Sequence, residues 1–165
     1  MASSFSPGPP PAPAGPSVAE LSTGEQLLLW AVRKRLEGEA QLPALRRGFR
    51  LADRGTHERD AFDAFEQLFG TIGRSCRRDL WFHRCGCGCV SNDELAILGL
   101  VAAEQSGDVA SALFLGRALV APAALAEAVE AARRLALALA ERGLALPLRQ
   151  RYAPAQLDDG SRRLH

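Results

Sequence analysis

The chain has 165 residues, of which 47% are hydrophobic and 24% charged, as is usual for a single globular domain. Its formal net charge of +1 excludes an overall field that would draw the whole chain to nucleic acid or an anionic membrane. The longest apolar run, 95–103, is about half of a membrane span, and the N-terminus lacks the parts of a secretory signal. We therefore expect a cytoplasmic protein that spans no membrane and keeps its cysteines reduced.

The first twenty residues differ in composition from the rest of the chain. They are rich in proline, serine, glycine and alanine, and six of the ten prolines lie between Pro7 and Pro16. Such a segment has too little apolar content to offset the entropy of ordering, so residues 1–20 are predicted to be a disordered tail. The helical domain is expected at 21–146, followed by a loose polar tail at 147–165.

Two helices are predicted at the start of the domain. Ser22 and Glu25 stand three residues apart, which is the spacing of a capping box. Apolar residues at helical spacing follow them, and Gly38 is a suitable end. A shorter helix is expected from Pro43, a good first helical residue, to Arg54.

The third predicted helix carries a stripe of aromatic and aliphatic residues. Thr56 is its expected cap, and Gly70 and Gly73 are expected to weaken its end. The chain then becomes extended, and burial statistics favour Trp81 and Phe82 as core residues.

Three further helices complete the expected fold. The second capping-box pattern, Ser91 and Glu94, opens a helix at 92–105 that is apolar nearly all round, as is typical of a central buried helix. Asp108 is expected to cap a helix at 109–120, and the last helix runs from Leu125 toward Gly143. The predicted fold class is all-α, an irregular bundle of five or six helices.

The strongest functional signal is a cluster of four thiols and one imidazole. Its members are Cys76, His83, Cys85, Cys87 and Cys89. They lie among glycines and arginines rather than on an apolar helix face, where lone structural cysteines usually lie. Zinc takes four such ligands in a tetrahedron, and Gly86 and Gly88 would let the loop turn its sulfurs inward. The cluster therefore predicts a structural zinc site that joins the third helix to the fourth.

The same residues allow other chemistry, because Cys-x-Cys is not the Cys-x-x-Cys spacing of common zinc knuckles. An iron–sulfur cluster also takes four thiolates, although its familiar spacings differ. A thiol switch is a further alternative, since two cysteines separated by one residue can close a strained, reducible disulfide. A glycine-rich loop with unused thiols is the remaining interpretation.

A basic cluster on the first two helices suggests nucleic-acid binding as another alternative. It comprises Arg33, Lys34, Arg35, Arg46, Arg47 and Arg50. If the two helices pack side by side, these residues would form a positive face, although nearby acidic residues dilute it. No nucleophile–base pair or open metal site stands out. We therefore expect a non-enzymatic interaction or regulatory protein with an unidentified protein partner.

The segment from His83 to Glu94, followed by the run from Leu98 to Gln105, resembles a block found in small uncharacterised helical proteins of proteobacteria. The resemblance covers about residues 22–142 and is specific only around that block. It implies a small helical fold in a bacterial protein. It brings no activity, substrate or metal ligand.

Overall fold

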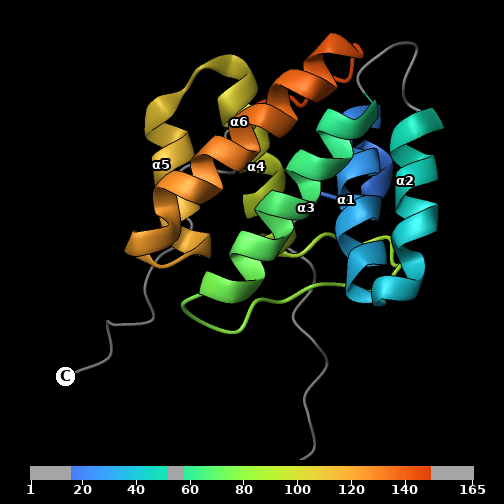
Figure 1. The fold of residues 1–165 in the computed structure, drawn as a ribbon, viewed down its shortest axis with the longest axis horizontal. Helices are drawn as coiled ribbons and strands as arrows, with labels where there is room; N and C mark the ends of the chain where they lie inside the picture. The colour runs from blue at the N-terminus through green and yellow to red at the C-terminus, as the bar shows by residue number, and fades with distance from the viewer. Residues whose placement is uncertain (1–15, 52–57, 150–165) are drawn as a thin grey trace, which may run out of the picture.

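The computed structural model describes residues 16–51 and 58–149. Within these ranges the chain forms six α-helices and no strand, which confirms the predicted fold class (Figure 1). The α-helices are α1 (Thr23–Leu36), α2 (Leu42–Leu51), α3 (Glu58–Ser75), α4 (Asn92–Ser106), α5 (Val109–Leu119) and α6 (Leu125–Glu141). Three short 3-10 helices accompany them: η1 (Val18–Glu20), η2 (Glu39–Gln41) and η3 (Pro122–Ala124). The expected helix end at Arg54 and the expected cap Thr56 lie outside the described residues.

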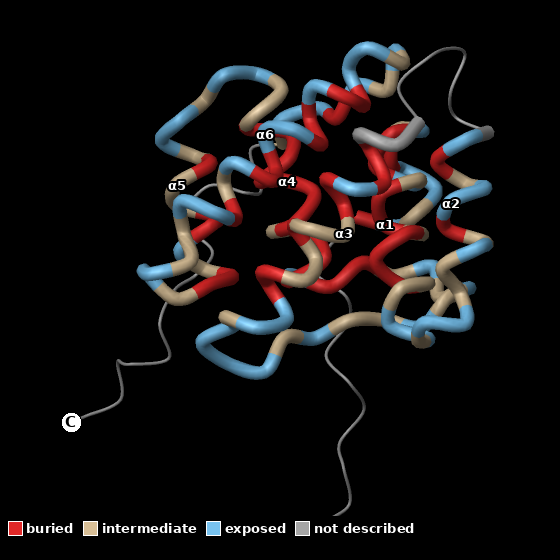
Figure 2. The backbone as a smooth tube through the Cα atoms, viewed as in Figure 1, coloured by how far each residue is buried: buried red, intermediate tan, exposed pale blue. Residues whose placement is uncertain are grey.

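Helix α4 is the centre of the fold, as its all-round apolar sequence predicts. It packs against α5 and α6 and also contacts α1, while α6 packs along α3 and α2 lies beside α1 and α3. Leu98, Leu100 and Val101 are almost completely buried. Figure 2 shows the buried backbone concentrated where these helices face one another.

The predicted caps Ser22, Ser91 and Asp108 are confirmed, whereas α2 begins at Leu42, one residue before the expected Pro43. Ser22 with Glu25 and Ser91 with Glu94 form reciprocal capping boxes, and Asp108 accepts a hydrogen bond from the backbone N–H of Ser111. Each device satisfies N–H groups that a helix start leaves without partners. Helix α3, however, continues through its glycines to Ser75, because its packing against α6 outweighs their weak helix propensity.

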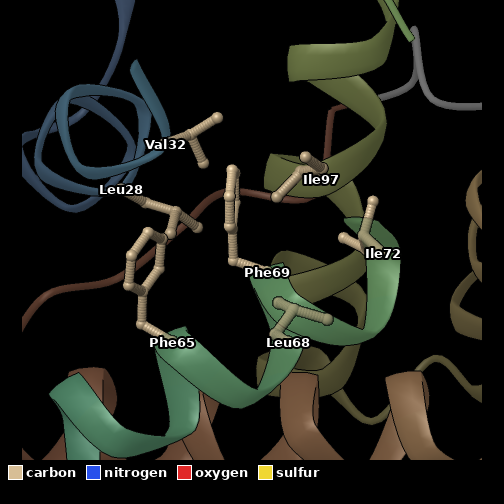
Figure 3. Close-up of a pocket in the computed structure, with 7 residues that line it drawn as sticks. All are labelled: Leu28, Val32, Phe65, Leu68, Phe69, Ile72 and Ile97. Carbon is tan, nitrogen blue, oxygen red and sulfur yellow. The ribbon is translucent and has the colours of Figure 1, made fainter. Parts of the chain in front are cut away.

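Helices α1, α3 and α4 meet at a small apolar pocket (Figure 3). Its lining consists of Leu28, Val32, Phe65, Leu68, Phe69, Ile72 and Ile97. It has no room for a water-sized molecule and no polar side chain to orient a ligand. We therefore regard it as a seam in the helix packing rather than a binding site.

Segments at both ends of the described chain return to the helical body. Pro16 is buried, and Ser17 pairs with Cys89 in an isolated antiparallel bridge. Near the other end, the Ser22 hydroxyl donates to the carbonyl of Ala145, and Arg149 pairs with the buried Glu25. Residues 16–20 and 147–149 of the two predicted tails are thus placed in the structure, whereas 1–15 and 150–165 lie outside the described residues.

Candidate functional site

The segment between α3 and α4 contains the cysteine cluster, and the N-terminus of α4 organises it. Glu94 accepts the backbone N–H of Ser91 at 2.8 Å within the capping box and the backbone N–H of His83 at 3.0 Å. Asp93 accepts the backbone N–H of Trp81, while the Ser91 hydroxyl donates to the Trp81 carbonyl. The first turn of α4 therefore fixes the extended chain that leads into the cysteines.

Arg33 connects this helix start to the cysteine loop. It projects from α1, is only 5% exposed, and forms an ion pair with Glu94 in which Nε and Nη2 donate at 2.8 and 2.9 Å. Its Nη1 donates to the Cys87 carbonyl at 2.7 Å, and its Nη2 donates to the Cys89 carbonyl at 2.5 Å. The planar fork of one guanidinium thus binds a carboxylate and two loop carbonyls together.

Cys87 and Cys89 form a thiol pair. The pKa of Cys89 is raised, first by side-chain hydrogen bonding with Cys87, then by the charge of Cys87 and by burial. The raised pKa favours the protonated form of Cys89. Arg33 holds both backbone carbonyls of the pair, so the two thiols are positioned by the protein itself.

Cys85 lies inside the turn that ends at Cys87, and its thiol interacts with Glu37 instead of with another cysteine. The turn runs from Arg84 to Cys87, and Gly86 adopts a φ of 88° that favours glycine. Burial raises the pKa of the Cys85 thiol, and its hydrogen bond to the Glu37 carboxylate raises it further. Glu37 is the residue that caps the end of α1, and no pattern in the sequence indicates that it interacts with this loop.

The five predicted metal ligands do not all come together. Cys85, Cys87 and Cys89 share one loop beside α1, whereas Cys76 lies at the end of α3, where it is exposed and pairs with Val120. His83 is tied through its backbone to Glu94. Among the described residues, no three His, Cys, Asp or Glu side chains are arranged to hold a metal ion.

The predicted basic cluster is divided between the two helices. On α1, Arg33 is buried, Lys34 pairs with Glu37 at 2.8 Å, and Arg35 pairs with Glu66 at 3.0 Å. On α2, the exposed members are Arg46, Arg47 and Arg50, and the first of them lies over the Phe62 ring. The α1 cations thus serve intramolecular contacts, and the nucleic-acid hypothesis now depends on α2.

The expectation that Trp81 is a core residue is wrong. Leu80 and Phe82 pack against the core, but the Trp81 side chain between them is 70% exposed. Successive side chains of an extended chain point to opposite sides, so burying residues 80 and 82 turns residue 81 toward solvent.

Sequence reasoning identified the cysteines but missed the groups that hold them, Arg33 and Glu94. The sequence pattern predicts Glu94 as part of a capping box and Arg33 as part of a positive face, whereas the structure pairs the two. Comparison of the chain with known protein families, with curated proteins and with solved structures gives no match. Within the described residues, no helix is both long and apolar enough to cross a membrane.

Proposed function

We propose that the protein is a non-enzymatic thiol switch in which Cys87 and Cys89 are the reactive pair. One observation carries the proposal: the two cysteines lie two residues apart in one loop, and Arg33 fixes both of their backbone carbonyls. A dithiol held in this way is prepared for an intramolecular reaction, because neither sulfur has to search for the other.

The internal bonding of the loop favours a switch over a purely structural metal site. The buried Arg33–Glu94 pair already joins the loop to α1 and α4. A metal is therefore not required to connect these elements, which was the role that the sequence suggested for zinc. Cys87 and Cys89 are half-buried, and their sulfur atoms connect no two elements, so they can change state without unfolding the domain.

The proposed reaction is thiol–disulfide exchange with a small-molecule disulfide. The Cys87 thiolate attacks one sulfur of the small disulfide, forming a mixed disulfide and expelling one thiolate. Cys89 then loses its proton and attacks the Cys87 sulfur, which forms the Cys87–Cys89 bond and expels the second thiolate. The protein loses two hydrogens and the small disulfide becomes two thiols. In a reducing cytoplasm such a bond would be transient, as a signal requires.

The first experiment treats the full-length protein with oxidised glutathione and measures intact mass and the disulfide map. We expect a mass loss of two hydrogens, with the bond assigned to Cys87 and Cys89. The Cys76→Ser variant is the matched control and should react as the wild type does, since Cys76 lies outside the loop. Glutathione that remains attached to Cys87, or no reaction at all, would contradict the proposal.

Zinc binding by the same loop is a second candidate. It is favoured by the position of Arg33, whose positive charge acts on both Cys85 and Cys87 and would offset the charge of a thiolate site. The sulfurs of Cys85, Cys87 and Cys89 would have to move closer together. His83 or a group from outside the chain would be the fourth ligand of the tetrahedral zinc site. Elemental analysis of protein purified without tag metals should then give about one zinc per chain, lost in the Cys87→Ser variant. A visible absorption band with iron would indicate an iron–sulfur cluster instead, and metal-free protein would exclude both metal hypotheses.

A further inference from the structure

The first described residues of the chain rest on the cysteine loop. We call residues 16–20 the N-terminal strap. Ser17 forms its antiparallel bridge with Cys89, and the backbone N–H of Val18 donates to the Gly88 carbonyl at 2.9 Å. Pro16 is buried, and Val18 packs partly against the core. The N-terminal strap is thus held by Gly88, which lies between the two cysteines, and by Cys89 itself.

Disulfide formation at this pair must change the backbone of the loop. A sulfur–sulfur bond is about 2.05 Å long, which is much shorter than the closest approach of the sulfurs of two free cysteines. Only one residue separates the two cysteines, so the ring has few torsions that can supply the contraction. Gly88 is that residue, and glycine has the widest choice of backbone angles. No heavy atom lies within 4 Å of the position of an added Cβ at Gly88, so the surroundings leave room for it to turn.

The Gly88 carbonyl is the acceptor for Val18, so a turn at Gly88 carries this acceptor away from its donor. The same movement displaces Cys89, the bridge partner of Ser17. Arg33 opposes the change, because it binds the carbonyls on both sides of Gly88. The strap and the loop are therefore coupled through the backbone of three consecutive residues.

We propose that formation of the Cys87–Cys89 disulfide turns Gly88 and releases the N-terminal strap, uncovering the apolar surface beneath Pro16 and Val18. This inference rests on the proposed thiol switch and states the structural change that the switch would cause. The chemical event at two sulfurs becomes a change in which surface of the protein is accessible.

The test uses the full-length chain with Cys76→Ser and Cys85→Ser, in which Cys87–Cys89 is the only disulfide that one chain can form. Hydrogen exchange of the Val18 amide is measured in the reduced and the oxidised protein, with amides of α4 as the internal reference. We expect exchange at Val18 to become at least about tenfold faster on oxidation, while the α4 amides stay protected. Oxidised protein whose Val18 exchange is unchanged would overturn the inference and leave the switch standing. Protein that fails to lose two hydrogens contradicts the switch, and the inference falls with it.

Gly88→Ala provides an independent test of the coupling. Gly88 does not adopt a positive φ, unlike Gly86, and an added methyl group meets no neighbour, so the reduced fold should accept alanine. Alanine has fewer accessible torsions, so disulfide formation should be several-fold slower than in the parent variant, with unchanged Val18 exchange in the reduced state. Gly73→Ala, which adds a methyl group on α3, is the matched control and should react at the parent rate. If Gly88→Ala oxidises and loses Val18 protection as the parent does, Gly88 is not the coupling residue.

Discussion

At the scale of single residues, Arg33 illustrates how one buried charge is made tolerable. Burial of an unpaired cation would be costly, but this guanidinium donates to the Glu94 carboxylate and to two loop carbonyls. Glu94 is equally buried and also accepts two backbone N–H groups. The Arg33–Glu94 ion pair therefore also anchors the cysteine loop. The ion pair between Lys34 and Glu37 is more exposed to solvent.

Replacing Arg33 with methionine should strongly destabilise the protein. The variant leaves Glu94 buried without its cation, and removal of one partner from a buried pair typically costs about 3–5 kcal/mol. Lys34→Met, at the adjacent half-exposed position, should lower stability far less, because both members of its ion pair reach solvent. Urea unfolding of both variants measures the difference. Equal midpoints for the two variants would show that the buried pair does not anchor the fold.

At the scale of elements, glycines decide how closely neighbouring helices approach. Gly48 on α2 faces the ring of Trp30 on α1, so that an added Cβ would collide with the indole. Gly73 on α3 has no atom within 4 Å of the same position. The two residues are similar in sequence context, since both lie inside a helix, but only Gly48 is required by packing.

Alanine substitutions at these two glycines should have opposite effects on stability. Gly73→Ala is expected to stabilise the protein by about 0.5–1 kcal/mol, because alanine has the higher helix propensity and meets no obstacle. Gly48→Ala gains the same propensity, but displacing the indole should cost about 1–3 kcal/mol and reverse the sign. Thermal unfolding of the two single variants tests this. Stabilisation by both would mean that the Trp30 ring moves aside without loss of packing.

At the scale of the whole molecule, contacts connect the start of α1 to the last described residues of the chain. Glu25, in the first turn of α1, pairs with Arg149 at 2.7 Å, near the end of the described chain. Burial acts to raise the pKa of Glu25, but the hydrogen bonds from Arg149 and Ser22 and the charge of Arg149 outweigh it. The net pKa lies below the ordinary value of 4.5, so the charged form is favoured in the folded state.

This lowered pKa predicts a loss of stability in acid. The unfolded chain binds a proton at Glu25 near pH 4.5 and the folded chain only at lower pH. The contribution is therefore complete above the unfolded pKa and disappears as the pH falls through the folded value. Glu25→Gln should lower stability at pH 7 and flatten its decline between about pH 5 and pH 3. Glu141→Gln, at an exposed position at the end of α6, is the control for urea unfolding across this range. An unchanged decline in Glu25→Gln would show that other carboxylates cause it.

Features that depend on neighbours a few residues apart could be predicted from the amino-acid sequence alone. The capping pairs Ser22–Glu25 and Ser91–Glu94 placed two helix starts, and the all-round apolar run placed α4 at the centre. Helix caps and helical periodicity are local properties, so they can be recognised in the sequence without knowledge of the tertiary structure. The Cys-x-Cys-x-Cys spacing likewise identified the loop that carries the candidate site.

Contacts between residues far apart in the chain could not be predicted in this way and are seen only in the folded structure. The Arg33–Glu94 pair joins positions 61 residues apart, and no spacing rule indicates such a partner. The same holds for the separation of Cys76 from the other thiols and for the exposure of Trp81, both of which follow from the path of the chain between α3 and α4. The physical reason is that the free energies of burial and ion pairing depend on distance in space and not on distance along the chain.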